Sequence, residues 1–212
     1  PSSAASDVYK RQGHILGSAQ ILIESTNNRL LITGDYKTSS DSSCQSFELV
    51  ECDQLITEAT FGLPVFQHPK PESEIKKIIN AFERSEKKTY IIGAYALGKS
   101  QRVIKLLRDI GYNDTIFLHG SQVKICDYYA SQGIDLGKLE PVAHKKNKDF
   151  EGKIVIAPPS ALKDKWSRRF SEPVICYASG WMSIKQRAKQ SLVEIPLIIS
   201  DHCDWNLSLI HI

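Results

Sequence analysis

The first sixty residues carry short apolar runs with β propensity, separated by polar turns. Ile21–Glu24 and Leu30–Thr33 are two such runs, and Thr26–Arg29 between them has the turn chemistry of a β-hairpin. A third strand is expected at Gln54–Glu58. The second run leads into Asp35 and the third ends in an acid, so carboxylates follow two of the three predicted strands.

The pattern changes after a group of prolines at positions 64, 69 and 71, which marks a boundary. Glu72–Arg84 reads as an amphipathic helix, and an alternation of strands and helices follows it. Such an alternation predicts a parallel sheet with helices on its faces. Leu139–Gly152 is expected to be a polar loop. The strands are expected at Tyr90–Ala94, Thr115–Leu118, Lys153–Ala157, Pro173–Ala178 and Leu197–Ser200, and the helices at Lys99–Asp109, Ser121–Ser131 and Ser160–Phe170.

The composition is that of an ordinary globular protein. The 212 residues are 42% hydrophobic and 24% charged, which is typical of a folded α/β chain. The net charge of +3 is too small to indicate a nucleic-acid partner. No apolar run approaches the roughly 18 residues of a membrane span. Five cysteines, an odd number at irregular spacing, favour reduced thiols and a cytoplasmic location.

The two ends of the chain do not resemble the rest. Residues 1–12 show no periodicity and run directly into a glycine-histidine motif, and residues 207–212 stop abruptly. Both resemble translated adaptor sequence, so we expect non-native tails there; an ordinary disordered tail is the alternative for the first.

Four polar residues follow apolar strands or begin glycine-containing loops, in four separate segments. They are His14, Asp35, Glu58 and His202. Ligands on loops at strand ends can converge on one edge of a layered sheet, and zinc accepts imidazole nitrogen and carboxylate oxygen. Two metal ions about 4 Å apart can hold the attacking and leaving oxygens of a phosphodiester. For each residue alone, a solvated turn or a capping role is the alternative.

Seven motifs occur in order along the chain: GHILGSAQ, LLITGDYK, LITEATFGLP, AYALGKSQR, FLHG, ASGWM and ISDHCDW. Together they resemble nucleases of the metallo-β-lactamase fold with a β-CASP insertion, and among them the bacterial ligase-associated DNA exonucleases. The resemblance implies an α/β protein, in which a partial αββα metallo-β-lactamase layer (residues 13–64 and 186–206) is interrupted by a β-CASP domain, a parallel sheet flanked by helices, at residues 65–185.

The resemblance also implies roles for individual residues. His14 and His202 would each ligate one zinc ion, and Asp35 would bridge the two. Glu58 would be the acid near the scissile phosphate, so that Asp35, Glu58 and His202 form the catalytic set. Asp204 would support His202 as a hydrogen-bonded carboxylate.

Two departures from the family pattern matter. The HxHxDH motif, which normally supplies most of the zinc ligands, is absent, and residues 1–13 hold no histidine. We therefore expect this chain to bind zinc weakly and not to cut DNA. The histidine that RNA-cutting relatives carry after the ASGWM region is also missing, because none lies between Cys176 and His202. That absence favours DNA over RNA as the substrate.

Five residues are candidates for contact with nucleic acid. Lys99 and Ser100 stand at a predicted helix start, where free amides favour phosphate, although an ordinary capped helix fits equally well. Lys185 and Arg187 belong to a basic cluster that could contact phosphates or simply face solvent. Trp181 could stack on a base or fill a core.

Three functions fit the sequence. The first is a zinc-dependent exonuclease, a phosphodiesterase acting on DNA in repair beside an ATP-dependent DNA ligase. The second is an RNA-processing nuclease of the same fold. The third is a non-catalytic module that binds nucleic acid or the ligase. Native coding sequence upstream of residue 13 would separate the third from the others, since an HxHxDH motif there excludes it.

Overall fold

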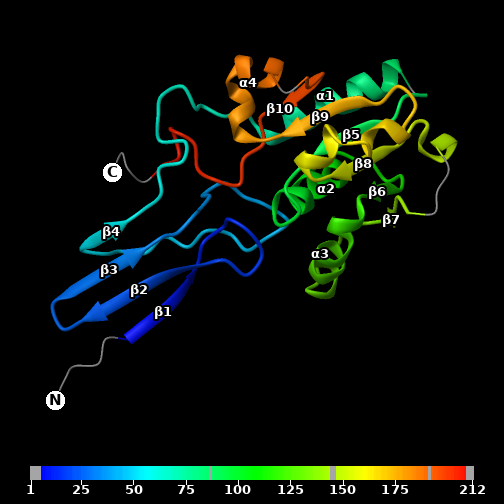
Figure 1. The fold of residues 1–212 in the computed structure, drawn as a ribbon. Helices are drawn as coiled ribbons and strands as arrows, with labels where there is room; N and C mark the ends of the chain where they lie inside the picture. The colour runs from blue at the N-terminus through cyan, green and yellow to red at the C-terminus, as the bar shows by residue number, and fades with distance from the viewer. Residues whose placement is uncertain (1–5, 86, 144–146, 191, 209–212) are drawn as a thin grey trace. The chain divides into compact units, whose positions relative to one another are not determined.

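The computed structural model describes residues 6–85, 87–143, 147–190 and 192–208. The chain divides into two compact units (Figure 1). The first unit is discontinuous and comprises Pro1–Gln67 and Asp201–Ile212, whereas the second is the single stretch His68–Ser200. The five cysteines are free thiols. No helix within the described residues has the length and apolar character needed to cross a membrane.

The first unit contains a four-stranded sheet. The predicted hairpin is present, because β2 and β3 pair antiparallel and Leu22 lies opposite Leu31. β3 then pairs parallel with β4, whose position agrees with the expected third strand. Leu22 and Leu31 are both buried, so one face of the sheet contributes to a core. The order is β1–β2–β3–β4, with bounds Ser6–Arg11, Ala19–Ser25, Asn28–Ile32 and Gln54–Ile56.

Residues 6–11, within the segment expected to be a non-native N-terminal tail, form a strand of this sheet. β1 pairs antiparallel along β2, with Lys10 opposite Gln20. Gln12 is buried, and its side-chain amide donates hydrogen bonds to the carbonyls of Ala19 and Thr33. Hydrogen bonds between the backbones of paired strands form with almost any side chain. The sequence of this segment therefore gave no clear signal for a strand. At the other end, residues 209–212 lie outside the described part of the chain.

The second unit is an open parallel sheet flanked by helices, as the sequence analysis predicts. All five strand pairings are parallel. The strand order is β10–β9–β5–β8–β6–β7. The strands are β5 (Tyr90–Gly93), β6 (Ile116–Leu118), β7 (Leu139–Pro141), β8 (Ile154–Ala157), β9 (Val174–Ala178) and β10 (Ile195–Leu197); the α-helices are α1 (Pro71–Arg84), α2 (Lys99–Asp109), α3 (Gly120–Ser131) and α4 (Lys185–Gln190).

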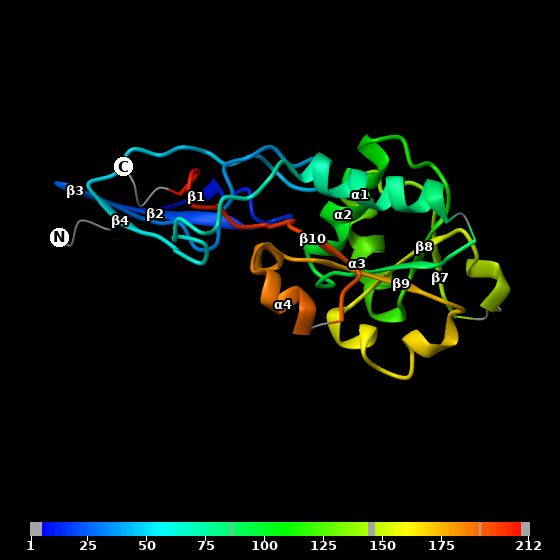
Figure 2. The same cartoon turned by 90° about the horizontal axis from the view of Figure 1, so that it is seen from above.

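Successive residues of β5 face opposite sides of this sheet. The hydroxyl of Tyr90 donates to the carbonyl of Ala81 in α1, which places α1 on that side. Ile91 belongs to a buried cluster with Phe117, Phe150 and Phe170 on the other side. Figure 2 shows α1 on one side of the sheet and the segments that follow β8 on the other. Both faces are therefore covered, which explains why the strands are continuous apolar runs.

Two local predictions were wrong. The segment expected to be a helix at Ser160–Phe170 forms two 3₁₀ turns, η2 (Pro159–Leu162) and η3 (Ser167–Arg169). Asp164 lies between them; its carbonyl accepts from both the amide and the hydroxyl of Ser167, and such local bonds compete with an α-helix. The expected loop at Leu139–Gly152 contains β7 and a third turn, η1 (Asn147–Phe150).

The boundary between the units also differs from the expected one. The sequence analysis assigns residues 186–206 to the first domain, but β10 pairs parallel with β9 through Ile195 and Cys176. This pairing holds residues 186–200 in the second unit, so the chain returns to the first unit only at Asp201.

Candidate metal centre

Loops after the strands of the first unit bring the candidate ligands together. His14 lies between β1 and β2, Asp35 follows β3, and Glu58 follows β4. His202 comes from the short segment that returns to this unit near the end of the chain. Gly13 has a positive φ of 77°, and a side chain there would collide with the backbone, so the turn that presents His14 requires glycine.

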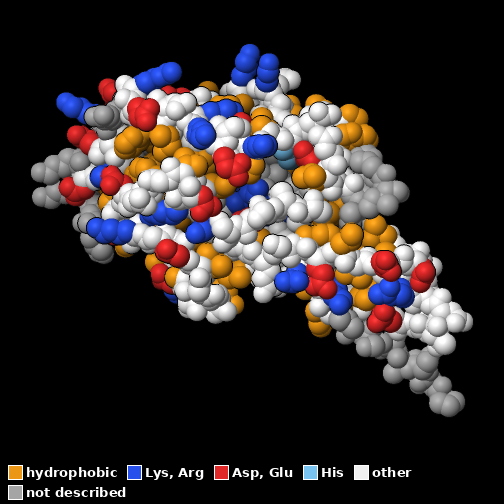
Figure 3. Space-filling view, turned by 180° about the vertical axis from the view of Figure 1, so that it is seen from behind, with side chains coloured by type: hydrophobic (Ala, Val, Ile, Leu, Met, Phe, Trp, Pro, Cys, Tyr) orange, Lys and Arg blue, Asp and Glu red, His pale blue; other side chains and the backbone are white. Residues whose placement is uncertain are grey.

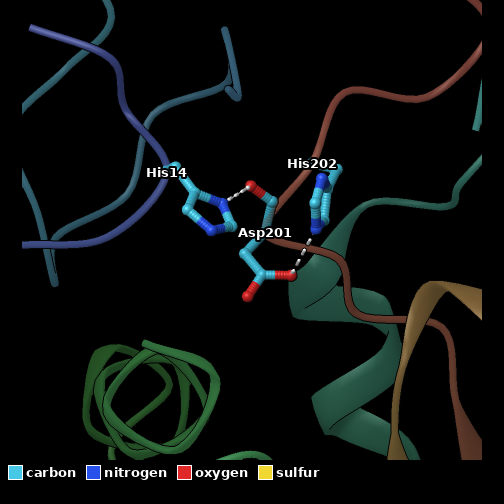
Figure 4. A group of neighbouring side chains, drawn as sticks. All are labelled: His14, Asp201 and His202. Carbon is cyan, nitrogen blue, oxygen red and sulfur yellow. Dashed lines mark hydrogen bonds and ion pairs between the residues drawn. The ribbon is translucent and has the colours of Figure 1, made fainter. Parts of the chain in front are cut away.

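The two histidine rings face a common space with acidic groups around it. Their centroids are 4.9 Å apart, with an angle of 59° between the ring planes. Nε2 of His14 lies 3.9 Å from a carboxylate oxygen of Asp35, and Nε2 of His202 lies 3.8 Å from Oδ1 of Asp201. Figure 4 shows His14, Asp201 and His202, with Nδ1 of His14 at 2.9 Å from the backbone carbonyl oxygen of Asp201.

Glu58 fixes the orientation of the His202 ring. Both carboxylate oxygens of Glu58 lie 2.9 Å from Nδ1 of His202. The same carboxylate accepts hydrogen bonds from the backbone amides of Tyr36, at 2.9 Å, and Thr60, at 3.3 Å. The ring of Phe61 packs edge-on against His202, with the centroids 6.0 Å apart. The imidazole is therefore held by its hydrogen bond to the Glu58 carboxylate and by packing against the Phe61 ring.

The charges of this cluster shift two pKa values in opposite directions. Burial alone would lower the pKa of His202, but the hydrogen bond to Glu58 and the charges of Glu58, Asp201 and Asp35 raise it above its usual value. Burial alone would raise the pKa of Glu58, but its hydrogen bonds, that with His202 first among them, lower it. Each shift stabilises the charged form of its group, and a metal ion bound at Nε2 of His202 would compete with a proton at that atom.

The donor set suits zinc. Two groups of three residues have ligand atoms that all lie within 4.8 Å of one another: His14, Asp201 and His202, and Asp35, Glu58 and His202. Nitrogen and carboxylate oxygen are zinc ligands, and two ligands on one tetrahedral zinc are about 3.4 Å apart. The nitrogen–oxygen separations of 3.8 and 3.9 Å are close to that value and too long for direct hydrogen bonds.

Asp201 is the member of this cluster that the sequence analysis missed. It precedes His202 directly in the SDH motif, so the signal was present. The sequence predicts Asp204 as the carboxylate that supports His202. In the structure the Asp204 carboxylate accepts a hydrogen bond from the amide of Leu207, at 3.1 Å. The carboxylate of Glu58 bonds the His202 ring, and the supporting role of Asp204 stays a prediction. Cys203 is buried, and burial raises the pKa of its thiol.

In the second unit, Lys99 and Ser100 form internal contacts. Both side chains are buried. The ammonium group of Lys99 donates to the carbonyl of Ile199, at 3.1 Å, and the hydroxyl of Ser100 donates to the carbonyl of Tyr95, at 2.7 Å. The expected phosphate contact is corrected accordingly, because these polar atoms hold the backbone around the start of α2. Trp181, Lys185 and Arg187 lie in η4 (Gly180–Ser183) and α4 of the same unit.

Comparison with known proteins supports a nuclease family. No family model matches the sequence. The chain is 27% identical over 197 residues to a protein of Opitutus terrae named "Probable DNA ligase", a match that covers 91% of this chain and 19% of that protein. It is 32% identical over 123 residues to "Endoribonuclease YSH1" of Eremothecium gossypii, covering 56% of this chain and 15% of that protein.

These relatives confirm the resemblance read from the motifs: the chain is related to nucleases of the metallo-β-lactamase fold that carry a β-CASP domain. It spans about a fifth or less of the length of the two relatives described above. A protein of unknown function from Enterococcus faecalis V583 shares the fold, with a TM-score of 0.56 and 9% identity over 96% of this chain and 56% of that one.

Proposed function

We propose that the intact protein is a zinc-dependent phosphodiesterase that hydrolyses DNA. The observation that carries the proposal is the convergence of His14, Asp35, Asp201 and His202, with Glu58 behind them, in one loop cluster of the first unit. We further propose that this unit is part of a metallo-β-lactamase layer and that the second unit is the β-CASP domain. The relatives with nuclease names support this assignment.

Zinc bound here would act as a Lewis acid, activating water and neutralising charge on the phosphate. The residues of this chain do the rest. His14 and His202 present imidazole nitrogens, and Glu58 keeps the ring of His202 in a fixed orientation. Asp35 has the most exposed side chain of the cluster, at 56%, and would be the carboxylate available to a second ion.

This chain by itself is expected to be a weak metal binder. The HxHxDH motif is absent from it, and the cluster described above lacks the ligands that the motif supplies in relatives. Metal affinity rises with the number of preorganised ligands, so partial occupancy and no hydrolysis are the expected properties of the 212-residue chain.

DNA is the favoured substrate, in a repair role beside an ATP-dependent DNA ligase. The relative named "Probable DNA ligase" matches 91% of the chain, which is the more extensive of the two sequence matches described above. RNA processing is the second candidate, because the endoribonuclease relative matches 56% of the chain at 32% identity. The missing histidine between Cys176 and His202 favours the first.

The test compares this chain with a longer one extended by its upstream coding sequence. Zinc content is measured by mass spectrometry, and cleavage is followed on DNA and RNA of the same sequence at matched salt. The proposal expects about two zinc ions and DNA hydrolysis in the extended protein only. An extended protein that binds nucleic acid but holds no metal and cuts nothing would instead support the non-catalytic module.

A further inference from the structure

The second unit contains a pocket of its own, with a volume of about 310 Å³. Its principal lining residues are Tyr95, Tyr177, Trp181 and Arg187, joined by Ser179 and Gln190. Tyr95 follows β5, Tyr177 lies in β9, and Trp181 and Arg187 come from η4 and α4. No residue of the metal cluster lines this pocket.

The topology of the sheet explains why a pocket forms at this place. β5 and β9 are neighbours, yet the chain leaves them in opposite directions. After β5 it crosses to β6, on one side, and after β9 it crosses to β10, on the other. In open parallel sheets, ligands bind beyond the carboxyl ends of the strands at such a switch point. Tyr95 and Trp181 stand in the two loops that leave β5 and β9 there.

The chemistry of the lining suits a group that is both aromatic and anionic. The guanidinium carbon of Arg187 lies 4.4 Å from the centroid of the Trp181 ring, a cation–π contact. Tyr95 is 59% exposed, so its ring is accessible to a ligand from solvent. None of the lining residues is acidic. Lys185 and Lys189 are exposed on the same short helix as Arg187 and extend the positive charge; Figure 3 shows Lys and Arg side chains protruding at the top of the view, over α4.

A second cavity provides a contrast. It has a volume of about 470 Å³ and lies at the end of α3, but Asp127 and Asp135 line it and no cation does. Carboxylates there disfavour a phosphate. The pocket between the β5 and β9 loops thus combines aromatic rings with a guanidinium group, which can pair a phosphate in bidentate fashion.

We propose that the pocket lined by Tyr95, Trp181 and Arg187 binds one unpaired nucleotide of a single strand. The base packs against the aromatic rings, and the adjoining phosphate pairs with Arg187. A base inside a duplex is stacked on both faces and cannot reach a side pocket, so the pocket selects an unpaired strand. The inference rests on the proposed function and adds a strand preference to it.

The test measures binding without catalysis. Fluorescence anisotropy of the full chain is recorded in a metal chelator with a 12-nucleotide single strand of DNA and with the corresponding blunt duplex. The single strand is expected to bind at least about 10-fold more tightly, and Trp181→Ala and Arg187→Ala are each expected to weaken it by about 10-fold. Tyr95→Ala, at an exposed position, provides a second aromatic variant that leaves the core intact.

Matched controls come from the same unit. Tyr128 is an exposed tyrosine on α3, and Arg84 is an exposed arginine at the end of α1; Tyr128→Ala and Arg84→Gln should leave the affinity unchanged. Deoxyadenosine monophosphate should displace the strand more effectively than inorganic phosphate. Equal affinities for single strand and duplex, no effect of the three pocket variants, or equal displacement by phosphate would each overturn the proposal.

Failure here is separable from failure of the nuclease proposal. The binding assay needs no metal ion, whereas the nuclease proposal stands or falls on zinc content and cleavage in the extended protein. Suppose that the extended protein holds zinc, cuts duplex DNA as readily as single strands and is unaffected by Trp181→Ala. That result would support the nuclease proposal and overturn the pocket proposal.

Discussion

Glu58 and His202 are joined by a hydrogen bond in which both carboxylate oxygens lie 2.9 Å from the same ring nitrogen, Nδ1. The contact links residues 144 positions apart in the sequence. It leaves Nε2 as the ring atom directed toward the carboxylate of Asp201. In metal sites, a carboxylate behind a histidine sets the tautomer of the ring and increases its basicity. Glu58 thus lies behind His202 as such a carboxylate, and the supporting role expected of Asp204 stays a prediction.

The first prediction separates these two carboxylates. Glu58→Gln should lower the pKa of His202, because it removes the main interactions that raise it, and should weaken zinc binding by about 10- to 100-fold. Asp204→Asn should change neither by a comparable amount. The His202 pKa is followed by NMR titration of the ring protons, and zinc affinity by competition with a chromophoric chelator. A larger loss in the Asp204 variant would restore its predicted role.

The second prediction concerns the ligands themselves. His14→Ala and His202→Ala should each reduce zinc affinity by at least about 100-fold, more than a change in a supporting carboxylate does. Asp35→Asn should reduce the number of bound ions in the extended protein, where we propose that it bridges. His119→Asn, in the second unit, is the matched control and should leave zinc content unchanged. Retention of zinc by both histidine variants would exclude the proposed centre.

The third prediction concerns a buried ion pair in the first unit. The ammonium group of Lys37 contacts the carboxylate of Asp41, and both side chains are at least 95% buried. Lys37→Met leaves a buried carboxylate without its cation and should cost about 3–5 kcal/mol. Glu24→Gln, which breaks the half-exposed pair with Arg29, should cost less than about 1 kcal/mol. Urea unfolding followed by circular dichroism compares the two, and equal costs would contradict the prediction.

The fourth prediction addresses the core of the second unit. Phe150 is fully buried and packs edge-on against Phe117 and Phe170, with centroid distances of 5.1 and 5.0 Å. Phe150→Ala should destabilise this unit by about 3–5 kcal/mol, through lost burial and the cavity left behind. Phe150→Leu keeps most of the volume and should cost roughly half as much or less. Thermal unfolding of the two variants gives the comparison.

The fifth prediction is a pH dependence at His119. Burial and the charge of Arg169 lower the pKa of His119, whose Nδ1 accepts a hydrogen bond from the amide of Ser121 at the start of α3. The unfolded chain therefore takes up a proton near pH 6.5 that the folded chain resists, and stability falls as the pH drops below that value. His119→Asn retains a capping side chain without the titration. The variant should lose less stability than the wild type between pH 7 and pH 5, and equal losses would contradict this.

Most helices and strands of the second unit could be predicted from the sequence because they are regular. The periodicity of Glu72–Arg84 and the apolar runs at β5 and β8 are each set by burial on one or both faces. The segment around Asp164 was misread, because local side-chain and carbonyl bonds decided the outcome there rather than periodicity. The compact units divide at residue 201 and not at the expected residue 186, because the pairing of β10 with β9 keeps the intervening stretch in the second unit.

Most residues of the candidate site could be named from the sequence, whereas the contacts among them could not. His14, Asp35, Glu58 and His202 were named from motifs that follow strands. Which carboxylate lies behind His202 depends on loop conformations that no local pattern encodes. The burial of Lys99 could not be predicted either, since a lysine at a helix start suggests a phosphate contact, whereas its ammonium group donates to a carbonyl inside the unit.

The discontinuity of the first unit affects the order in which the protein can fold during translation. His14 and its hydrogen-bond partner Asp201 are 187 positions apart. At a translation rate of about 5–20 residues per second, roughly 10 to 40 s pass between their appearance on the ribosome. The second unit can fold in that interval, but the proposed metal centre cannot be completed before Asp201 and His202 have been made. During synthesis, therefore, the second unit is complete before the proposed metal centre of the first unit can form.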